Sequence, residues 1–560
     1  MSLRKSLLNR VSRAVSYLAT ALVLCGATME ARAASPTLEH LYPAGISSGT
    51  SRSVRSVGKL DPWPPKVWVS GTGIRFEAEE KEQNWKVIAD KNAPPGPRLV
   101  RFYNDEGASI PRYLIVSHTR DGKESEPNDR IGEANSIREL PILTHGRLDR
   151  KQDTDLFRVH LRKGETFIAR LDAYVLGSTT DAILRLLDQD NRVLDWNHDH
   201  YYLDPCIFYE VPSTGYYWVQ VMGFPYPATA SEELGGGDGY IYRLFMSNST
   251  YIREQNVSSE GELSLMGWNL TSPDILTKRT HALQASMELA THFKSALISA
   301  NRVNSEIEPN DSDETATPLI SNARGVIQSN EDIDWFSFDV EKDAWHQFEI
   351  QSARLGYPSD LLLKLYDEHG KEIKSDDDAA TMNDPRIIWK SAESGRYFLK
   401  VTSLTHQGGE NQVYRLIHSI KKPTCELTTS ASEFALKPGE SLEIKVGIER
   451  KHGHTRTLII QPANLPAGIS CAPVIADKKR KEITLKLHAT PSSSQFQGLL
   501  SIIGKEQDDW NQTFLAGKAT VATKVNNGVP SGYLDQVYRK IHHLWLTIQS
   551  KTQPKETEEN

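Results

Sequence analysis

An acidic segment occurs twice in this chain, and the repeat constrains the fold more than any other feature. Residues 124–129 read Glu-Ser-Glu-Pro-Asn-Asp, and residues 306–311 read Glu-Ile-Glu-Pro-Asn-Asp. Each copy is followed by an Asp-x-Asp motif, at 153–155 and at 332–334, and then by similar strand-like stretches. A long-period internal repeat predicts two copies of one structural unit. At 560 residues the chain is also too long for a single core, so we expect several domains.

Alternation of apolar and polar residues predicts that both repeat units are antiparallel sandwiches. Residues 157–161 read Phe-Arg-Val-His-Leu, and residues 336–340 read Phe-Ser-Phe-Asp-Val. This period of two is typical of a strand with one face in a core. Dense Pro and Gly turn signals between short alternating runs predict further sandwiches at 34–120 and 421–525. We therefore expect an all-β chain of tandem β-sandwich domains.

Two segments do not follow this pattern. Residues 263–270 resemble a strand and turn, but the stretch that follows, up to Asn301, is rich in Ala, Leu and Met and is compatible with a helix. Both interpretations of 250–304 stay open, because propensity is a weak guide. The tail has an apolar stripe at helical spacing, which predicts a short amphipathic C-terminal helix. The stripe consists of Tyr533, Val537, Ile541, Leu544 and Ile548.

The N-terminus has the pattern of a secretion signal. A basic start is followed by the apolar stretch 14–27 and by Ala31-Arg32-Ala33, a small-x-small cleavage site. This pattern predicts a secreted, periplasmic or cell-surface protein. A lipid anchor on Cys25 is the alternative, and Leu24 before it disfavours that processing. No later segment is long and apolar enough to predict a membrane span. The net charge of −7 argues against nucleic acid as the main partner.

Three cysteines remain after the predicted signal peptide. Cys425 and Cys471 fall in one predicted domain, where an oxidising compartment would allow them to pair. Cys206 would then be a single thiol. The alternative is that all three are small core residues with no disulfide.

The repeated acidic segment suggests cation chemistry. Calcium takes six to eight hard oxygen ligands from carboxylates, amides and carbonyls. In an extended segment alternate side chains share one side, so the segment and the later Asp-x-Asp strand would supply a cluster of oxygens if they meet. Surface turns that bind no ion are the alternative. The candidate ligands are Glu124, Glu126, Asn128, Asp129, Asp153 and Asp155, and, in the second unit, Glu306, Glu308, Asn310, Asp311, Asp332 and Asp334.

Both units resemble bacterial pre-peptidase C-terminal (PPC) domains. The resemblance is carried by the Glu-Pro-Asn-Asp opening, the Asp-x-Asp strand before an aromatic residue, the Asp-Pro pairs at 204–205 and 384–385, and the Gly-x-Tyr strand. It implies β-sandwich accessory modules of secreted proteins. The related collagen-binding domains of clostridial collagenases bind calcium through the corresponding acidic residues, so the resemblance implies up to two calcium sites here.

The N-terminal region resembles the IPT/TIG immunoglobulin-like domains of large secreted planctomycete-type proteins. Pro36-Thr37-Leu38, Pro43-Ala44-Gly45 and the turn 71–74 carry this resemblance, and Gly267-Trp268-Asn269-Leu270 looks like a degenerate second copy. The expected order is a signal peptide at 1–33, an IPT/TIG-like domain at 34–120, a PPC-like domain at 121–249, a degenerate Ig-like segment at 250–304, a second PPC-like domain at 305–420, an Ig-like sandwich at 421–525 and a tail at 526–560.

No catalytic motif has its required context. Residues 45–49 match G-x-S-x-G, but the neighbouring sequence predicts a β-sandwich turn rather than a strand-turn-helix elbow. We expect a non-catalytic protein that binds extracellular protein or polysaccharide. A structural spacer, an envelope component and an accessory subunit of a secreted peptidase or hydrolase are the alternatives. Aromatic residues near strands and loops of the first unit are the candidate ligand contacts: Tyr201, Tyr202, Tyr216, Trp218 and Tyr226.

Overall fold

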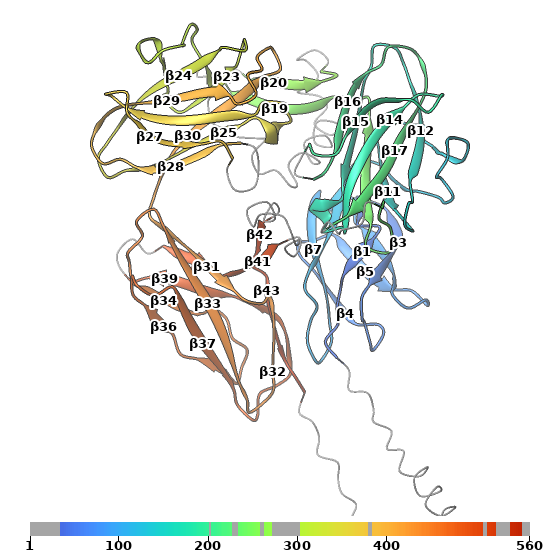
Figure 1. Ribbon diagram of the computed structural model, residues 1–560. Coiled ribbons are helices and arrows are strands. Elements are labelled where there is room, and N and C mark those ends of the chain that lie inside the picture. The colour runs from blue at the N-terminus through green and yellow to red at the C-terminus, as the bar shows by residue number, and fades with distance from the viewer. Residues whose placement is uncertain are drawn as a thin grey trace, which may run out of the picture.

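The computed structural model describes residues 34–200, 203–226, 233–257, 263–270, 303–378, 384–507, 512–521 and 538–550. These residues form tandem β-sandwich domains, which confirms the predicted fold class (Figure 1). The described residues include no helix that is long and apolar enough to cross a membrane. The predicted signal peptide and most of the stretch after Leu270 lie outside the described residues.

Residues 34–120 form the N-terminal sandwich, which has two four-stranded sheets. The strand orders are β1-β3-β6-β5 and β2-β8-β7-β4. Its core contains Trp85, Phe102 and Val100, and the Trp85 and Phe102 rings stack with centroids 4.9 Å apart. The strands are β1 (His40–Tyr42), β2 (Gly45–Ser47), β3 (Ser51–Val57), β4 (Lys66–Val69), β5 (Ile74–Ala78), β6 (Asn84–Ala89), β7 (Gly96–Tyr103) and β8 (Arg112–Ser117).

Repeat unit 1 (121–249) and repeat unit 2 (305–420, with β21 just before it) have the same topology. In unit 1 the five-stranded sheets run β10-β12-β17-β14-β15 and β16-β13-β18-β11-β9. In unit 2 they run β22-β24-β29-β26-β27 and β28-β25-β30-β23-β21, so every strand has a counterpart. The repeat seen in the sequence is therefore a repeat of the complete strand order.

The strands of unit 1 are β9 (Asp121–Lys123), β10 (Asn135–Ser136), β11 (Ile142–Arg147), β12 (Asp155–Leu161), β13 (Thr166–Asp172), β14 (Thr180–Leu187), β15 (Val193–Asn197), β16 (Cys206–Glu210), β17 (Gly215–Pro225) and β18 (Ile241–Ser247), with 3-10 turns η1 (Ile131–Glu133) and η2 (Tyr174–Leu176). Those of unit 2 are β21 (Val303–Ser305), β22 (Thr317–Pro318), β23 (Asn322–Val326), β24 (Ile333–Val340), β25 (Trp345–Gln351), β26 (Leu361–Asp367), β27 (Glu372–Asp376), β28 (Arg386–Lys390), β29 (Gly395–Ser403) and β30 (Val413–Lys421), with η4 (Asp313–Thr315) and η5 (Ala353–Leu355).

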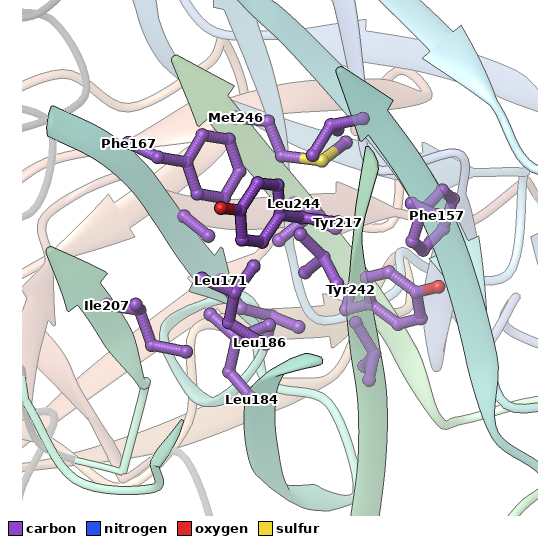
Figure 2. Packing of buried hydrophobic residues seen from close by; sticks show 14 of the residues in the cluster. Phe157, Phe167, Leu171, Leu184, Leu186, Ile207, Tyr217, Tyr242, Leu244 and Met246 are labelled. Carbon is purple, nitrogen blue, oxygen red and sulfur yellow. The ribbon is translucent and has the colours of Figure 1, made fainter. Parts of the chain in front are cut away.

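The core of unit 1 lies between its two sheets. On β12 the side chains of Phe157, Val159 and Leu161 are buried, whereas Arg158 and His160 are exposed, as the alternation in the sequence predicts. Figure 2 shows Phe157 and Tyr242 beside Leu244 and the other core residues contributed by both sheets.

A two-stranded hairpin follows unit 1. It consists of β19 (Tyr251–Val257) and β20 (Leu263–Trp268), so the strand predicted at 263–270 is present. The Trp268 ring stacks on Phe208 of β16 with centroids 3.6 Å apart, and Tyr251 packs against the same ring. The hairpin thus packs on repeat unit 1. The Ig-like interpretation of 250–304 stays a prediction, because residues 271–302 lie outside the described part.

Residues 421–550 form the C-terminal sandwich. Its sheets run β35-β37-β33-β31-β41-β42, β36-β34-β39-β40 and β32-β43-β38. The strands are β31 (Thr424–Thr429), β32 (Glu433–Leu436), β33 (Ser441–Lys451), β34 (Leu458–Pro462), β35 (Ile469–Cys471), β36 (Val474–Ala476), β37 (Glu482–Ala489), β38 (Phe496–Leu500), β39 (Ile502–Glu506), β40 (Thr513–Leu515), β41 (Gly517–Val521), β42 (Tyr538–Ile541) and β43 (Leu544–Ile548).

The predicted C-terminal helix is wrong for the described part of the tail, which adds β42 and β43 to this sandwich. Leu544, Leu546 and Ile548 point into its core, and all five residues of β43 are buried. A strand buried on both faces carries apolar residues on each face, and some of these, such as Leu544 and Ile548, also fall at helical spacing. Tyr533 and Val537 lie outside the described residues.

No disulfide joins Cys425 and Cys471, so the alternative with three thiols applies. Cys206 and Cys425 are buried and Cys471 is partly buried.

The two terminal sandwiches contact one another, so the chain returns on itself (Figure 1). Arg101 of β7 is fully buried and donates a hydrogen bond to the backbone oxygen of His543 at 3.1 Å. The ring of Trp545 on β43 lies 4.8 Å from Tyr103 and 6.1 Å from Trp68, measured between centroids. Aromatic and arginine side chains of this kind dominate tight interfaces.

Candidate metal centre

The opening acidic segment and the Asp-x-Asp strand of unit 1 meet at one end of the sandwich. Glu124 directly follows β9, and its N–H donates to the backbone oxygen of His145 at 3.0 Å. Asp155 begins β12. Carboxylate oxygens of Glu124, Glu126 and Asp155 all lie within 4.8 Å of one another. A cation site was expected only if the acidic segment and the Asp-x-Asp strand meet. In unit 1 they do meet.

A second acidic group adjoins the first and shares Glu126. Oxygens of Glu126, Asp129 and Asp153 also lie within 4.8 Å of one another. Arg150 pairs with Asp129 and lies 3.6 Å from Asp153, so a protein cation already neutralises part of this group. Within the described part of the chain no ion pair involves Glu124 or Asp155, and their group recurs in unit 2, which makes it the better candidate.

Hydrogen bonds hold the carboxylates of the first group in place. Glu124 Oε1 accepts the backbone N–H of Arg147 at 2.6 Å, and Glu124 Oε2 accepts the Tyr242 hydroxyl at 2.9 Å. Tyr242 also contacts Asp155 Oδ2. The backbone oxygen of Asn128 accepts the Leu156 N–H at 3.0 Å, which ties the acidic segment to β12. The cluster is thus a built arrangement and not a chance meeting of surface side chains.

A glycine in each unit makes room for the tyrosine–glutamate contact. A Cβ built on Gly146 would lie 2.0 Å from the Tyr242 ring and 2.5 Å from Glu124 Oε2. A Cβ on Gly325 would lie 2.3 Å from the Tyr414 ring and 2.5 Å from a Glu306 oxygen. Real Cβ atoms do not approach other atoms so closely, so any side chain at Gly146 or Gly325 would displace the cluster.

Several oxygens of the cluster are buried without a hydrogen-bond donor. Buried polar atoms normally have a partner, because an unpaired one costs desolvation free energy. Here the unpaired oxygens belong to the acidic segment and the Asp-x-Asp strand, which fits a site built to receive a cation. They are Glu126 Oε1, Asn128 Oδ1, Asp129 Oδ1, Asp153 Oδ1 and Asp155 Oδ1 in unit 1, and Asn310 Oδ1 and Asp334 Oδ1 in unit 2.

The pKa values of the carboxyl groups also indicate a site that a positive charge would stabilise. Burial raises the pKa of Glu124 to about 7 and that of Asp153 to about 6. Burial, together with the neighbouring Glu124 carboxylate, raises the pKa of Asp155 well above its usual value. Like charges in a buried place favour protonation, and a bound cation removes that penalty by favouring the ionised form.

Unit 2 repeats the first group with small differences. Carboxylate oxygens of Glu306, Glu308 and Asp334 lie within 4.8 Å of one another, and Tyr414 contacts Asp334 as Tyr242 contacts Asp155. Burial raises the pKa of Glu306 to about 7 and that of Asp334 to about 9. Asp311 and Asp332 do not join this group. They line an open hollow beside it, together with Glu308.

Sequence reasoning missed the tyrosines that hold the carboxylates. Tyr242 on β18 and Tyr414 on β30 lie 87 and 80 positions from the aspartates that they contact. A signal was present, because each is followed by Arg-Leu, and the Tyr-Arg-Leu triplet recurs at 242–244 and 414–416. The triplet was not recognised as part of the repeat because it reads as ordinary core strand.

The predicted aromatic ligand contacts separate into three groups. Tyr216 is 54% exposed on the outer face of the β10-β12-β17-β14-β15 sheet. Trp218 and Tyr226 instead belong to the ordinary packing of the sandwich, which is the alternative for these candidates, since both are more than nine-tenths buried. Trp218 is covered by Ile131 and Ala134, and Tyr226 packs edge-on against Tyr174. Tyr201 and Tyr202 lie outside the described residues.

Two exposed aromatic residues of unit 1 were not predicted. Trp196 on β15 is 56% exposed and Phe224 on β17 is 39% exposed. Both belong to the sheet that carries Tyr216, and the guanidinium of Arg158 lies 4.9 Å from the Tyr216 ring centroid.

The serine of the G-x-S-x-G match is a structural residue. Ser47 ends β2, is buried, and donates its hydroxyl hydrogen bond to the backbone oxygen of Thr119 at 2.7 Å. A nucleophile elbow requires an exposed serine between a strand and a helix, so this motif match has no catalytic context.

No family model and no curated protein match this chain. Among solved structures, the pre-peptidase C-terminal domain of a collagenase from Bacillus anthracis is 14% identical, with 22% of this chain and 99% of that domain covered and a TM-score of 0.16. The periplasmic lysozyme inhibitor PliG of Aeromonas hydrophila is 13% identical, covering 22% and 100%, with a TM-score of 0.15. Fibronectin(III)-like modules of Clostridium thermocellum CbhA are 14% identical, covering 29% and 78%, with a TM-score of 0.11. Because these TM-scores are low, the assignment of β-sandwich domains is based on the strand order of this chain and not on these similarities.

Proposed function

We propose that this is a secreted, non-catalytic, multi-domain protein whose PPC-like repeat units are stabilised by calcium and bind an extracellular protein or polysaccharide. The observation that carries the proposal is the partly buried cluster of carboxylates with unpaired oxygens, which occurs at the same place in both units. The resemblance to PPC domains supports it through the same residues.

The donor set favours calcium over other metals. In both units all side chains of the cluster offer hard oxygens, and no histidine or cysteine belongs to the three acidic groups. Zinc and copper prefer nitrogen and sulfur ligands, and magnesium demands near-ideal octahedral geometry with several waters. A set of carboxylates, with the unpaired amide oxygen of Asn128 or Asn310 in the same segment, is the kind of site that calcium occupies.

Calcium would stabilise each unit by neutralising its buried carboxylates, and the melting temperature of the full chain tests this. Calcium at about 100 times its Kd stabilises a folded protein by about 2.7 kcal/mol, so we expect the melting temperature to rise by about 5 °C or more over the value in chelator. Magnesium at the same concentration is the control and should give a smaller rise. Equal melting temperatures in calcium and in chelator would contradict the proposal.

The outer face of the β10-β12-β17-β14-β15 sheet is the best candidate for contact with a partner. Trp196, Tyr216 and Phe224 expose large apolar area there. Such exposed aromatic surface marks interaction sites more often than chance, because aromatic rings supply much contact area for little loss of conformational entropy. Rings on a sheet face offer stacking surfaces to sugar rings and to extended apolar chains alike.

The double variant Trp196→Ala and Tyr216→Ala tests this face. We expect retention of the wild-type chain on at least one of a panel of collagen-like proteins and cell-wall or matrix polysaccharides, and an affinity at least about tenfold weaker for the variant. Ile320→Ala, which changes an 81% exposed residue of unit 2, is the matched control and should bind like the wild type. Retention of the wild type on none of the panel would favour a structural spacer or an envelope component.

A further inference from the structure

The two acidic clusters differ in one contact that comes from another domain. Tyr42 lies at the end of β1 in the N-terminal sandwich and is more than nine-tenths buried. Its hydroxyl donates a hydrogen bond to Glu124 Oε1 at 2.9 Å. Its ring lies 4.8 Å from Lys123 Nζ and 5.2 Å from the Arg147 guanidinium. A side chain of one sandwich is therefore built into the acidic cluster of the next.

This contact determines which lone pairs of Glu124 stay open. Oε1 accepts from Tyr42 and from the Arg147 backbone N–H, which uses both of its lone pairs. Oε2 accepts from Tyr242, and Glu124 also shares a hydrogen bond with Asp155. The same Tyr242 hydroxyl contacts Asp155 Oδ2, so Oε2 is the Glu124 oxygen on the side of Asp155. Tyr42 thus occupies Oε1 and fixes Glu124 in an orientation that keeps Oε2 on the side of Asp155, where a cation would be bound.

The corresponding carboxylate of unit 2 has no such support within the described part of the chain. Glu306 Oε1 accepts the Val326 N–H at 2.8 Å, and Glu306 Oε2 lies 3.5 Å from the Tyr414 hydroxyl. Both donors belong to unit 2 itself. The chain therefore contains two versions of one site, and they differ by a hydrogen bond that crosses a domain boundary.

We propose that Tyr42 is a positioning residue of the cation site in unit 1, so that this site is shared by two domains and cation binding strengthens docking of the N-terminal sandwich. The proposal rests on the calcium binding proposed above. Residues that orient a metal ligand typically change metal affinity by about 10–100-fold when they are removed. Coupling between two binding events is reciprocal, so a tyrosine that favours calcium binding is itself held more tightly once calcium is bound.

Docking of the N-terminal sandwich does not depend on Tyr42 alone. Arg52 forms an ion pair with Asp121 at 2.9 Å, and both side chains are largely buried. An apolar cluster also crosses the junction, with Ala44 and Ile115 on one side and Val175, Leu176 and Ile241 on the other. Removal of the Tyr42 hydroxyl should therefore leave the two domains together, which makes Tyr42→Phe a clean test.

The test isolates each site by inactivating the other. In full-length Asp334→Asn protein, in which only the site of unit 1 remains complete, we expect Tyr42→Phe to weaken calcium binding about tenfold in isothermal titration calorimetry. In Asp155→Asn protein, in which only the site of unit 2 remains complete, the same substitution should leave calcium affinity unchanged. A purely structural tyrosine would weaken neither site or both.

Hydrogen exchange provides the second readout. Calcium should slow amide exchange in residues 40–47 of the Asp334→Asn protein, and Tyr42→Phe should reduce that slowing. If Asp334→Asn protein binds calcium with the same affinity with and without the Tyr42 hydroxyl, the inference is overturned while the calcium proposal stands. If neither parent protein binds calcium, both fail.

Discussion

Asp155→Asn is expected to stabilise the calcium-free protein and to remove the stabilisation that calcium gives to repeat unit 1. The Asp155 side chain is fully buried, and burial with the nearby Glu124 carboxylate raises its pKa well above the usual value. At pH 7 the unfolded chain ionises Asp155 freely, whereas the folded chain must either protonate it or bury its charge. Asparagine keeps an acceptor for Tyr242 and removes the charge, so we expect a gain of about 1–3 kcal/mol in chelator.

Chemical denaturation in chelator and in saturating calcium measures both halves of this prediction. The variant should be more stable than the wild type in chelator and less stable in calcium. Asp334→Asn should repeat the inversion in unit 2. Asp339→Asn is the control, because the Asp339 side chain is 75% exposed and its pairing with Arg396 is a surface contact. If Asp155→Asn destabilises the protein equally in both solutions, the carboxylate serves only as a hydrogen-bond acceptor and binds no cation.

The cluster could be predicted in part because the repeat carries local information. Glu124, Glu126 and Asp155 recur in unit 2 in the same order and at similar spacing, and such a repeat predicts a repeated strand order. The acidic segment follows the edge strand β9 of one sheet, and Asp155 begins β12 of the other sheet, so a meeting of the two in one unit implies a meeting in both. Asp311 and Asp332 match the pattern equally well but lie outside the acidic group of unit 2, because the pattern does not determine which side chains turn inward at the end of a sandwich.

Long-range partners could not be predicted in the same way. Tyr42 reaches Glu124 from 82 positions earlier and from a different domain, and no spacing rule links the two. Trp218 points to the outer face of its sheet, as alternation predicts, but Ile131 and Ala134 cover it. Alternation assigns a side chain to one face of a sheet, and it contains no information on which loop or domain covers that face.

In the C-terminal tail, too, the sequence pattern did not show what covers each face, and here a strand was predicted as a helix. Leu544, Leu546 and Ile548 fill the core, and Trp545 and Thr547 on the opposite face of β43 are buried as well. A surface strand would expose its outward residues to solvent, so the burial of Trp545 and Thr547 shows a second covering layer. The N-terminal sandwich supplies that layer through Trp68, Tyr103 and Arg101.

Trp545→Ala is expected to release the contact between the two terminal sandwiches. The side chain is only 2% exposed and lies between aromatic rings of the N-terminal sandwich and the rest of β43. Truncation of a buried tryptophan costs about 3–5 kcal/mol through lost packing and the cavity that remains. Most of the packing lost here lies between domains, so we expect a larger radius of gyration in small-angle scattering and earlier melting of the terminal sandwiches.

Trp196→Ala separates this effect from the loss of any tryptophan, because Trp196 is 56% exposed and lies on the outer face of unit 1. That control should scatter and melt like the wild type. Arg101→Met should act in the same direction as Trp545→Ala, since Arg101 bonds to the backbone oxygens of Ser109 and His543 and lies 3.6 Å from Glu433. Wild-type scattering from both interface variants would mean that the terminal sandwiches are held together elsewhere. An expanded chain that retains its calcium-dependent stability would instead show that the acidic clusters act within each unit and do not need the closed arrangement.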